Sequence, residues 1–275
     1  MSEPLLTIEE LVVEKQNESK AIINQLNLQI AKGEMIGLIG ESGCGKSMTA
    51  RTILNLLPGQ MNAKGKILYK NRNLLELSHQ EHRKLLGKEI GIIFQDYRGS
   101  FTPFIRIGKQ IIETIRAHNP ISKKEAKKMA VDVLTGMGLE AERVYRSYPF
   151  QLSGGQVQRA AIAMSLALKP SLLICDEVTT ALDVMSGEKV LDYIEKMRKE
   201  TGCAVLMITH DLTQAYKRTD KIYVMEHGEI VESGTPEVIR CDHRHPYTKK
   251  LCGCVLALPG EGSGVQPTRE KVMFI

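Results

Sequence analysis

The octapeptide GESGCGKS at residues 40–47 matches the pattern G-x-x-x-x-G-K-[ST] at every fixed position. It follows an apolar run at 35–39 and precedes a helix-compatible stretch at 48–57. In this setting the glycines let backbone N–H groups point at a phosphate, and the helix N-terminus adds partial positive charge. Lys46 would reach the β- and γ-phosphate oxygens of ATP, and Ser47 would offer its hydroxyl to Mg²⁺. The candidate nucleotide-binding residues here are Gly40, Glu41, Ser42, Gly43, Cys44, Gly45, Lys46, Ser47 and Met48.

A second apolar run ends in two acidic residues. Residues 172–175, LLIC, precede Asp176 and Glu177, the pattern of a buried strand that delivers carboxylates to its C-terminal end, where ligands gather in parallel sheets. Because successive strand residues point to opposite faces, the two carboxylates should act differently. Asp176 would hold Mg²⁺ together with Ser47, and Glu177 could polarise the attacking water. Apolar runs followed by acids are common, so this prediction depends on the phosphate loop.

A third motif, LSGGQ, occupies residues 152–156, upstream of the acidic strand. Ser153, Gly154 and Gly155 stand at the start of a helical stretch, where a hydroxyl and unhindered N–H groups can bind a phosphate. A single chain has no evident use for two phosphate sites.

The pentapeptide, followed by Gln158 and Arg159, resembles the signature sequence of ABC ATPases. The resemblance implies that two nucleotide-binding domains pack head to tail, and that each signature closes on the γ-phosphate held by the other subunit. Gln156 is then expected in the nucleotide site with the serine and the two glycines. The fold implied is a P-loop NTPase (RecA-like) core with an antiparallel β subdomain and an inserted α-helical subdomain.

Further landmarks of that family follow in the expected order: Gln95, Asp183 and His210. By resemblance, Gln95 contacts Mg²⁺ or water and reports the nucleotide state to the helical subdomain, and Asp183 lies at the dimer seam. His210 would contact the γ-phosphate and position the water of Glu177. The expected catalytic residues are Glu177, His210 and Lys46, and the expected Mg²⁺ ligands are Ser47, Gln95 and Asp176.

Two features depart from the family pattern. ABC ATPases usually stack adenine on an aromatic side chain ahead of the phosphate loop, but residues 11–21 contain none, and Lys15 stands near the expected place. The contact to the base is therefore not predicted. Val178 follows Glu177 where proline is typical, a change that we expect to be neutral for phosphate chemistry.

Residues 179–184, TTALDV, and 245–251, HPYTKKL, resemble the peptide and nickel branch of bacterial ABC importers. This resemblance implies transmembrane permease subunits, a second, non-identical ATP-binding subunit, and an extracytoplasmic solute-binding protein. Peptide-importing members often extend further and carry a C-terminal cysteine cluster, whereas this sequence ends soon after Cys252 and Cys254. Together with the segment at 96–103, the short end favours the nickel or metallophore members, and an oligopeptide or dipeptide importer is the alternative.

Soft sulfur and imidazole ligands gather late in the sequence and could form a metal site. The residues are Cys241, His243, His245, Cys252 and Cys254. Their spacing is not a standard zinc pattern, and the His-Pro pair already belongs to the HPYTKKL motif. We therefore predict no metal ligands there and expect the cysteines to be free thiols.

The elements that position these motifs follow an α/β pattern. Apolar, β-prone runs separated by helical stretches predict a mostly parallel sheet with helices on its faces. The runs lie at 35–39, 90–94, 172–175 and 204–209. Two shorter runs, 222–225 and 230–231, flank His227 and Gly228, which predicts a tight hairpin with glycine in its turn.

A different texture between the second and third runs predicts an inserted helical subdomain. Its helical segments lie near 109–118 and 123–137. Ser122 and Glu125 form a capping-box pattern ahead of the second segment. The expected apolar face of that helix consists of Ala126, Met129, Val133, Leu134 and Met137.

These elements suggest three parts. An ATP-binding core with the β subdomain would comprise 1–95 and 153–240, and the helical subdomain 96–152. Regular patterning fades after Arg240, so the tail, 241–275, is expected to be loosely ordered, above all at the breaker-rich stretch 259–266.

The segment after Gln95, residues 96–107, is expected to dock the permease, because it joins the phosphate-sensing strand to the helical subdomain. The expected exposed apolar anchors are Tyr97, Phe101, Phe104 and Ile105. The alternative is that these side chains fill the junction between the subdomains.

Composition excludes several classes. With 43% hydrophobic and 25% charged residues, the 275-residue chain has an ordinary globular composition. No apolar run approaches the roughly 18 residues of a spanning helix, and no secretory signal is visible, so we expect a peripheral protein on the cytoplasmic face of the membrane. A net charge of +5 gives little support for nucleic-acid binding. ABC ATPases that act on nucleic acid or ribosomes usually carry two modules or a long coiled coil, and neither is found. Glu177 and His210 argue against an ATP-binding regulator without turnover.

Overall fold

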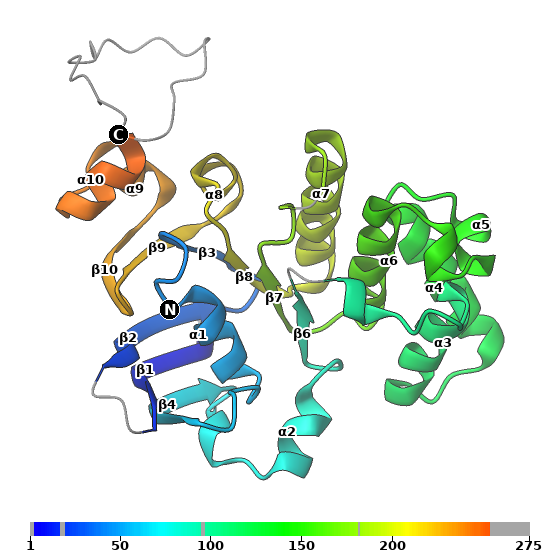
Figure 1. Ribbon diagram of the computed structural model, residues 1–275, viewed down its shortest axis with the longest axis horizontal. Coiled ribbons are helices and arrows are strands. Elements are labelled where there is room, and N and C mark those ends of the chain that lie inside the picture. The colour runs from blue at the N-terminus through cyan, green and yellow to red at the C-terminus, as the bar shows by residue number, and fades with distance from the viewer. Residues whose placement is uncertain (1–2, 17–19, 95–96, 181, 254–275) are drawn as a thin grey trace.

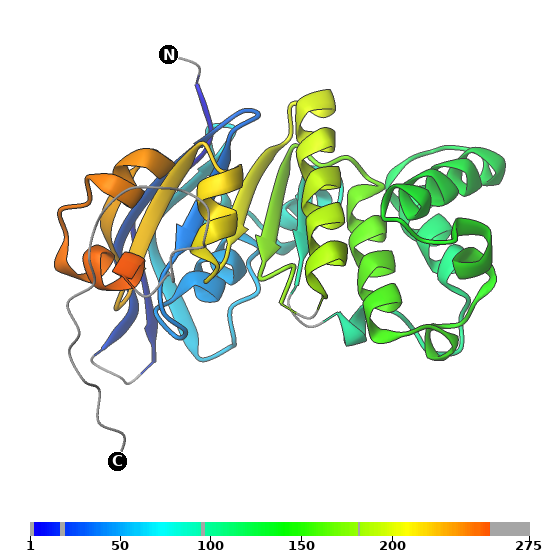
Figure 2. The same ribbon diagram turned by 90° about the horizontal axis from the view of Figure 1, so that it is seen from above.

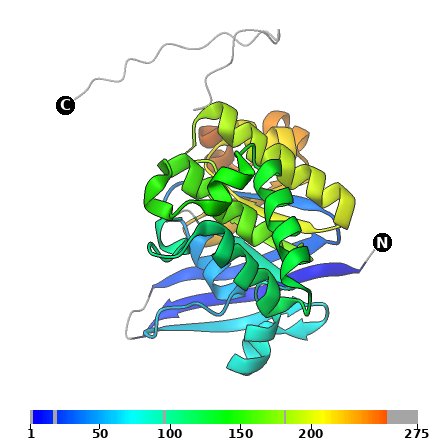
Figure 3. The ribbon, with the colours of Figure 1, turned by 90° about the vertical axis from the view of Figure 1, so that its right-hand side faces the viewer.

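A six-stranded sheet lies at the centre of the computed structural model, with a four-stranded antiparallel sheet on one side and a group of helices extending from the other (Figure 1). The structure describes residues 3–16, 20–94, 97–180 and 182–253. Figure 3 looks onto the helical part, with the antiparallel strands below it. This arrangement confirms the predicted α/β class with an antiparallel β subdomain and an inserted helical subdomain.

The central sheet has the strand order β10-β9-β3-β8-β7-β6, and all strands from β9 to β6 in that order run parallel. Every residue of β3, β7 and β8 is buried, as expected for a parallel sheet covered on both faces. The bounds are β3 Met35–Ile39, β6 Ile90–Ile93, β7 Leu172–Asp176, β8 Ala204–Ile208, β9 Lys221–Glu226 and β10 Glu229–Gly234. The four apolar runs are thus strands, as predicted.

The two faces of the central sheet serve different cores, because side chains alternate along each strand. In β7, Leu172 and Ile174 face the core shared with the antiparallel sheet, whereas Leu173 and Cys175 face the core shared with the helical part. The antiparallel sheet has the order β2-β1-β4-β5. Its bounds, and those of the helices near it, are β1 Pro4–Lys15, β2 Ala21–Ala31, β4 Met61–Tyr69, β5 Arg72–Asn73, α1 Lys46–Ile53, η1 Leu74–Glu76 and α2 His79–Leu85.

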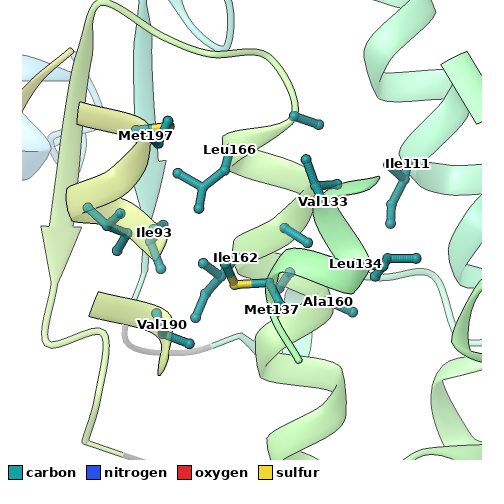
Figure 4. Packing of buried hydrophobic residues seen from close by; sticks show 14 of the residues in the cluster. Ile93, Ile111, Val133, Leu134, Met137, Ala160, Ile162, Leu166, Val190 and Met197 are labelled. Atoms are coloured by element: carbon teal, nitrogen blue, oxygen red, sulfur yellow. The ribbon is translucent and has the colours of Figure 1, made fainter. Parts of the chain in front are cut away.

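The helical part packs on the central sheet through one continuous apolar cluster that includes Ile93, Ile162, Val190 and Met197 (Figure 4). Figure 2 shows α6 and α7 side by side between the sheet and the other helices. The bounds are η2 Arg98–Ser100, α3 Ile107–His118, α4 Lys123–Gly136, α5 Ala141–Arg146, η3 Pro149–Gln151, α6 Gly154–Leu166, α7 Val184–Thr201 and α8 Leu212–Arg218.

The start and the apolar face of α4 are as predicted. Ser122 Oγ accepts a hydrogen bond from the Glu125 backbone N–H at 3.2 Å, and the Glu125 carboxylate accepts one from the Ser122 N–H at 2.9 Å, which completes the capping box. Of the expected face, Met129 is partly buried, and the residues Ala126, Val133, Leu134 and Met137 are buried.

The C-terminal region differs in part from the expectation. The predicted hairpin is present: β9 pairs antiparallel with β10 across His227 and Gly228, both at positive φ. Beyond it the chain forms α9, Pro236–Cys241, and α10, Pro246–Gly253. The expectation of loose order is therefore wrong for 246–253, because Tyr247 is buried against the sheet. The breaker-rich stretch at 259–266 lies outside the described residues.

Candidate nucleotide site

The phosphate loop leaves β3 and enters α1 through two glycines that no other residue could replace. Gly40 has φ +154°, and a Cβ there would lie 2.2 Å from the Met225 carbonyl oxygen of β9. Gly45 has φ +117°, and its Cβ would lie 2.6 Å from the Met225 methyl carbon. The loop is also tied to the β9–β10 turn, since the Gly228 N–H donates to the Cys44 carbonyl at 2.9 Å.

Lys46 is buried at the start of α1, and its ammonium lies inside the loop. It donates to the carbonyl oxygens of Gly40, at 2.7 Å, and of Glu41, at 2.8 Å. These neutral acceptors hold the cation beside the N-terminus of α1, where a phosphate would offer it charged oxygens. The loop therefore presents one positive charge and a helix N-terminus on the same side.

Ser47 and Asp176 meet at the C-terminal edge of the sheet although 129 residues separate them. The Ser47 hydroxyl donates to a carboxylate oxygen of Asp176 at 3.0 Å. Burial raises the pKa of the Asp176 carboxyl, and the hydrogen bond from Ser47 opposes this rise. A hydroxyl and a buried carboxylate side by side are hard oxygen donors of the kind that Mg²⁺ prefers, so these residues fit a Mg²⁺ ion.

Glu177 is oriented by its neighbours rather than by strand geometry alone. Its φ is +50°, in the left-handed region that costs a residue with a side chain about 1 kcal/mol or more. Its N–H donates to the Ile208 carbonyl at 3.0 Å, and Thr180 Oγ1 lies 3.3 Å from its Oε2. His210 Nδ1 lies 3.3 Å from Glu177 Oε1. The carboxylate is thus held next to an imidazole at the same edge of the sheet as Asp176.

The signature motif forms the exposed N-terminus of α6. Ser153 Oγ accepts from the Gln156 N–H at 3.4 Å, and Gln156 Oε1 accepts from the Ser153 N–H at 3.0 Å. Ser153 and Gly154 are exposed, and Gly155 is half-buried. In two views a quarter turn apart, β6 and α7 lie between α1 and α6 (Figures 1 and 2). The signature is therefore not brought to the phosphate loop of its own chain.

The signature helix is nevertheless connected to the acidic loop. The buried Gln158 side chain donates from Nε2 to the Val178 carbonyl at 3.0 Å. Val178 itself is buried, which is consistent with an apolar residue at this position. A displacement of α6 would therefore act on the backbone of Val178, the residue after Glu177. The sequence analysis noted Gln158 only as part of the motif.

Asp183 caps the long helix α7, because its carboxylate accepts from the Ser186 N–H at 3.0 Å. Hydrogen bonds from the Ser186 side chain and from its N–H lower the pKa of the exposed Asp183 carboxyl. The next two residues are exposed although they are apolar, with exposed fractions of 80% for Val184 and 69% for Met185. Gln95, expected at the Mg²⁺ ion, lies outside the described residues.

The expected docking segment is only partly exposed. Phe104 is 83% exposed and Tyr97 and Ile105 are half-buried. Phe101 is buried in the cluster that joins the helical part to the sheet, so its assignment as an exposed anchor is wrong. Its ring fills the junction between the subdomains, which was the alternative interpretation for these side chains.

Two residues that contact the phosphate loop were not predicted from the sequence. Tyr247, in α10, accepts a hydrogen bond on its hydroxyl from the Glu41 N–H at 2.8 Å. Lys250, one turn further along α10, lies 3.4 Å from the Glu41 carboxylate. The signal was present in the HPYTKKL motif, which was interpreted only as a marker of the importer branch.

The strand, phosphate loop and helix, with two carboxylates at the end of a neighbouring strand, define a P-loop nucleotide hydrolase. Residues 23–180 match the family model described as ABC transporter. The chain is 38% identical over 248 residues to the metal-staphylopine import system ATP-binding protein of Staphylococcus aureus, a match that covers 90% of this chain and 92% of that protein. It is 41% identical over 243 residues to the oligopeptide transport ATP-binding protein of Bacillus subtilis, covering 87% of this chain and 68% of that protein.

A dimeric post-hydrolysis structure of the ATP-binding cassette MJ0796 bound to ADP and Pi has the same fold. It is 29% identical to this chain with a TM-score of 0.75, and the match covers 84% of this chain and 98% of that one. The chain belongs to the ABC transporter family, in which it is an ATP-hydrolysing subunit.

Proposed function

We propose that this chain powers a bacterial importer of nickel or other metal chelates, with small peptides as the alternative cargo class. The observation that supports the choice is the match to the metal-staphylopine relative, which extends over 90% of this chain, compared with 87% for the oligopeptide relative. Identity alone does not separate the two classes, because it is 38% to the first protein and 41% to the second.

In the proposed site, ATP binds to the backbone N–H groups of residues 40–47 and to the Lys46 ammonium. Ser47, Asp176 and Gln95 would hold Mg²⁺, which neutralises charge on the β- and γ-phosphates when bound. Glu177 accepts a proton from the attacking water or orients it, and His210 holds that carboxylate and water in place. The support is geometric: the Ser47–Asp176 and Glu177–His210 pairs lie at the same edge of the sheet.

We propose further that the complete site contains two chains. The Ser153 hydroxyl and the N–H groups of Gly154 and Gly155 would close on the γ-phosphate held by a second, similar but non-identical ATP-binding subunit. Three observations support this: the signature is exposed, it lies away from its own phosphate loop, and exposed apolar residues follow Asp183. Exposed apolar side chains in a row are typical of a surface that another subunit covers.

The permease is expected to dock beside η2, where a groove of about 320 Å³ opens between β6, η2 and α6. Phe94, 41% exposed, and Tyr97 line it, and Phe104 stands exposed seven residues further on. An apolar groove of this kind fits a short amphipathic helix. No described helix is long and apolar enough to span a membrane. We accordingly propose a peripheral place on the cytoplasmic face, below permease subunits that an extracytoplasmic solute-binding protein supplies.

Uptake by cells that lack this chain tests the cargo class. Cells complemented with the wild type should accumulate radioactive nickel in the presence of a chelator, and cells complemented with Glu177→Gln should not. Labelled dipeptides serve as the competing cargo in the same cells. Restored dipeptide uptake with unchanged nickel uptake would assign the chain to a peptide importer. If cells with Glu177→Gln take up both nickel and dipeptides as well as cells with the wild type, a role of this chain in either kind of import is contradicted.

A further inference from the structure

The peptide unit between Gly40 and Glu41 is held at both of its polar ends. Its carbonyl oxygen, that of Gly40, accepts from the Lys46 ammonium at 2.7 Å. Its N–H, that of Glu41, donates to the Tyr247 hydroxyl at 2.8 Å. Because a peptide unit is planar, these two bonds fix the orientation of the plane at the point where β3 becomes the phosphate loop.

Nucleotide binding is expected to affect these two hydrogen bonds differently. Lys46 is the only one of the two that is expected to contact phosphate, so its bonds to Gly40 and Glu41 compete with the bound state. The bond from the Glu41 N–H to Tyr247 does not involve Lys46, so movement of the lysine need not break it. Gly40 has a backbone conformation that only glycine readily adopts, so without Tyr247 the freed plane would have little else to hold it.

Tyr247 is itself firmly placed. It is 7% exposed and packs in a small cluster with Ile39, the last residue of β3, and Leu212 of α8. Figure 1 shows α9 and α10 beside β9 and β10, at the end of the molecule far from the helical part. Burial raises the pKa of the Tyr247 hydroxyl, which therefore remains neutral and able to accept at physiological pH.

The rest of the contact between α10 and the loop contributes less. Lys250 and Glu41 form an ion pair at 3.4 Å, but their side chains are 72% and 60% exposed, so solvent screens it. A second tyrosine anchors the same helix without touching the loop: the Tyr216 hydroxyl lies 3.1 Å from Cys252 Sγ. Tyr247 therefore links α10 to the phosphate loop, whereas the Tyr216 hydroxyl contacts α10 at Cys252.

We propose that Tyr247 is a positioning residue of the nucleotide site: its hydroxyl fixes the Gly40–Glu41 peptide plane, so that the phosphate loop keeps its binding conformation while Lys46 changes partners. The segment from α9 to α10 is then part of the nucleotide-binding unit and not an appended tail. The proposal depends on ATP binding at this loop and is independent of the cargo.

Because the loop contacts phosphates that ATP and ADP share, the effect of Tyr247 falls on binding in the ground state and the transition state alike. Tyr247→Phe removes one neutral hydrogen bond and keeps the ring, so we expect the Kd for Mg-ATP, and that for ADP, to rise about fivefold. The KM for ATP should rise by the same factor with kcat nearly unchanged, which is the pattern of lost uniform binding.

The experiment measures nucleotide binding and steady-state turnover of the full chain, in the assembled transporter for the kinetics. Tyr216→Phe is the matched control, because it makes the same chemical change in the anchoring of α10 and should leave both Kd values within about twofold of the wild type, as expected for a site away from the loop. Binding by the wild type in the same assay shows separately that the nucleotide site itself is intact.

Three results would overturn the proposal. In the first, Tyr247→Phe binds ATP and ADP as the wild type does. In the second, Tyr216→Phe weakens binding as much as Tyr247→Phe, which would mean that α10 acts only through the stability of its docking. A fall in kcat without a change in KM would also contradict it, because that pattern places Tyr247 in the chemical step.

Discussion

His210 Nδ1 lies 3.3 Å from Glu177 Oε1, although 33 residues separate the two in the chain. The cause is the parallel pairing of β7 with β8, in which Asp176 lies opposite Ile208, so that both strands end at the same edge. The Glu177 carboxylate side chain is 17% exposed and that of His210 is 60% exposed. The pair is therefore set between the interior of the chain and a surface that a second subunit can cover.

Replacement of the loop lysine should act on binding. Lys46→Ala removes the ammonium that now donates to the Gly40 carbonyl and that we propose binds the phosphates in the ground state as well as in the transition state. We expect the Kd for ATP to rise by about tenfold or more, as for a lost charge-assisted hydrogen bond. Calorimetric titration of the full chain measures it. Wild-type affinity of this variant for ATP would contradict the assignment of Lys46 to the nucleotide site.

Turnover should depend on pairing, because α6, which begins at the signature, is separated from α1 and its phosphate loop by β6 and α7. The isolated chain should be a weak ATPase whose specific activity rises with protein concentration, and rises further when the partner ATP-binding subunit is added. Ser153→Arg, which places a bulky side chain at the exposed helix start, should abolish that gain and leave ATP binding by the single chain intact. High activity, independent of concentration, from a proven monomer would contradict the two-chain site.

Cysteine crosslinking to the cytoplasmic loops of the permease tests the docking surface. Phe104→Cys, at an 83% exposed position, should crosslink in a background that carries Cys241→Ser, because Cys241 is the exposed native thiol among the described residues. Lys249→Cys, exposed on α10, is the control and should not react with the permease. Reaction at position 249 and none at 104, in a transport-competent complex, would move the docking surface to the other end of the molecule.

The join between α7 and α8 should be sensitive to pH. Hydrogen bonds from Lys217 and Gln214, together with Arg218, lower the pKa of the Glu188 carboxyl to about 2. A lowered pKa stabilises the fold above the unfolded-state pKa of about 4.5, and this contribution disappears as the pH falls through the folded-state value. We expect Glu188→Gln to lower the free energy of unfolding by about 1–3 kcal/mol at neutral pH.

Urea titrations between neutral pH and pH values below 4.5 measure this difference, which should shrink as the solution becomes more acidic. Glu200→Gln, on the same helix, is the matched control, because within the described part of the chain Glu200 forms an ion pair with an exposed lysine, Lys196, at 3.8 Å. It should cost about 0.5 kcal/mol or less at every pH. An equal loss in both variants, or a Glu188 effect that does not change with pH, would contradict the assignment.

The strands and the phosphate site could be predicted because their signals are local. Continuous apolar runs such as 172–175 are typical of buried parallel strands, and the positive φ of the loop glycines is a local requirement that favours glycine. Two predictions were wrong because the structure at these positions depends on contacts between residues that are distant in sequence. The burial of Phe101 depends on helices that are distant in sequence, and the helix at 246–253 is short and held by packing of Tyr247 rather than by its own pattern.

Within the site, spacing predicted which residues would gather but not how they contact each other. The Ser47–Asp176 hydrogen bond follows from strand order, which the sequence only implied. The positive φ of Glu177 and its contact with His210 depend on the backbone after β7, which no residue pattern revealed. The bond from Glu41 to Tyr247 joins positions 206 residues apart, so the HPYTKKL motif contained Tyr247 but could not indicate that its hydroxyl reaches the phosphate loop.

Glu177 carries the central claim, that the carboxylate after β7 activates the water that attacks ATP. Phosphate release by the assembled transporter with Mg-ATP, compared between the wild type and Glu177→Gln, tests it most directly. The variant keeps the size and shape of the side chain but replaces one acceptor oxygen by an NH2 donor and cannot take a proton, so we predict unchanged ATP affinity and a kcat lower by about 100-fold or more. Turnover of Glu177→Gln at the wild-type rate would contradict the account.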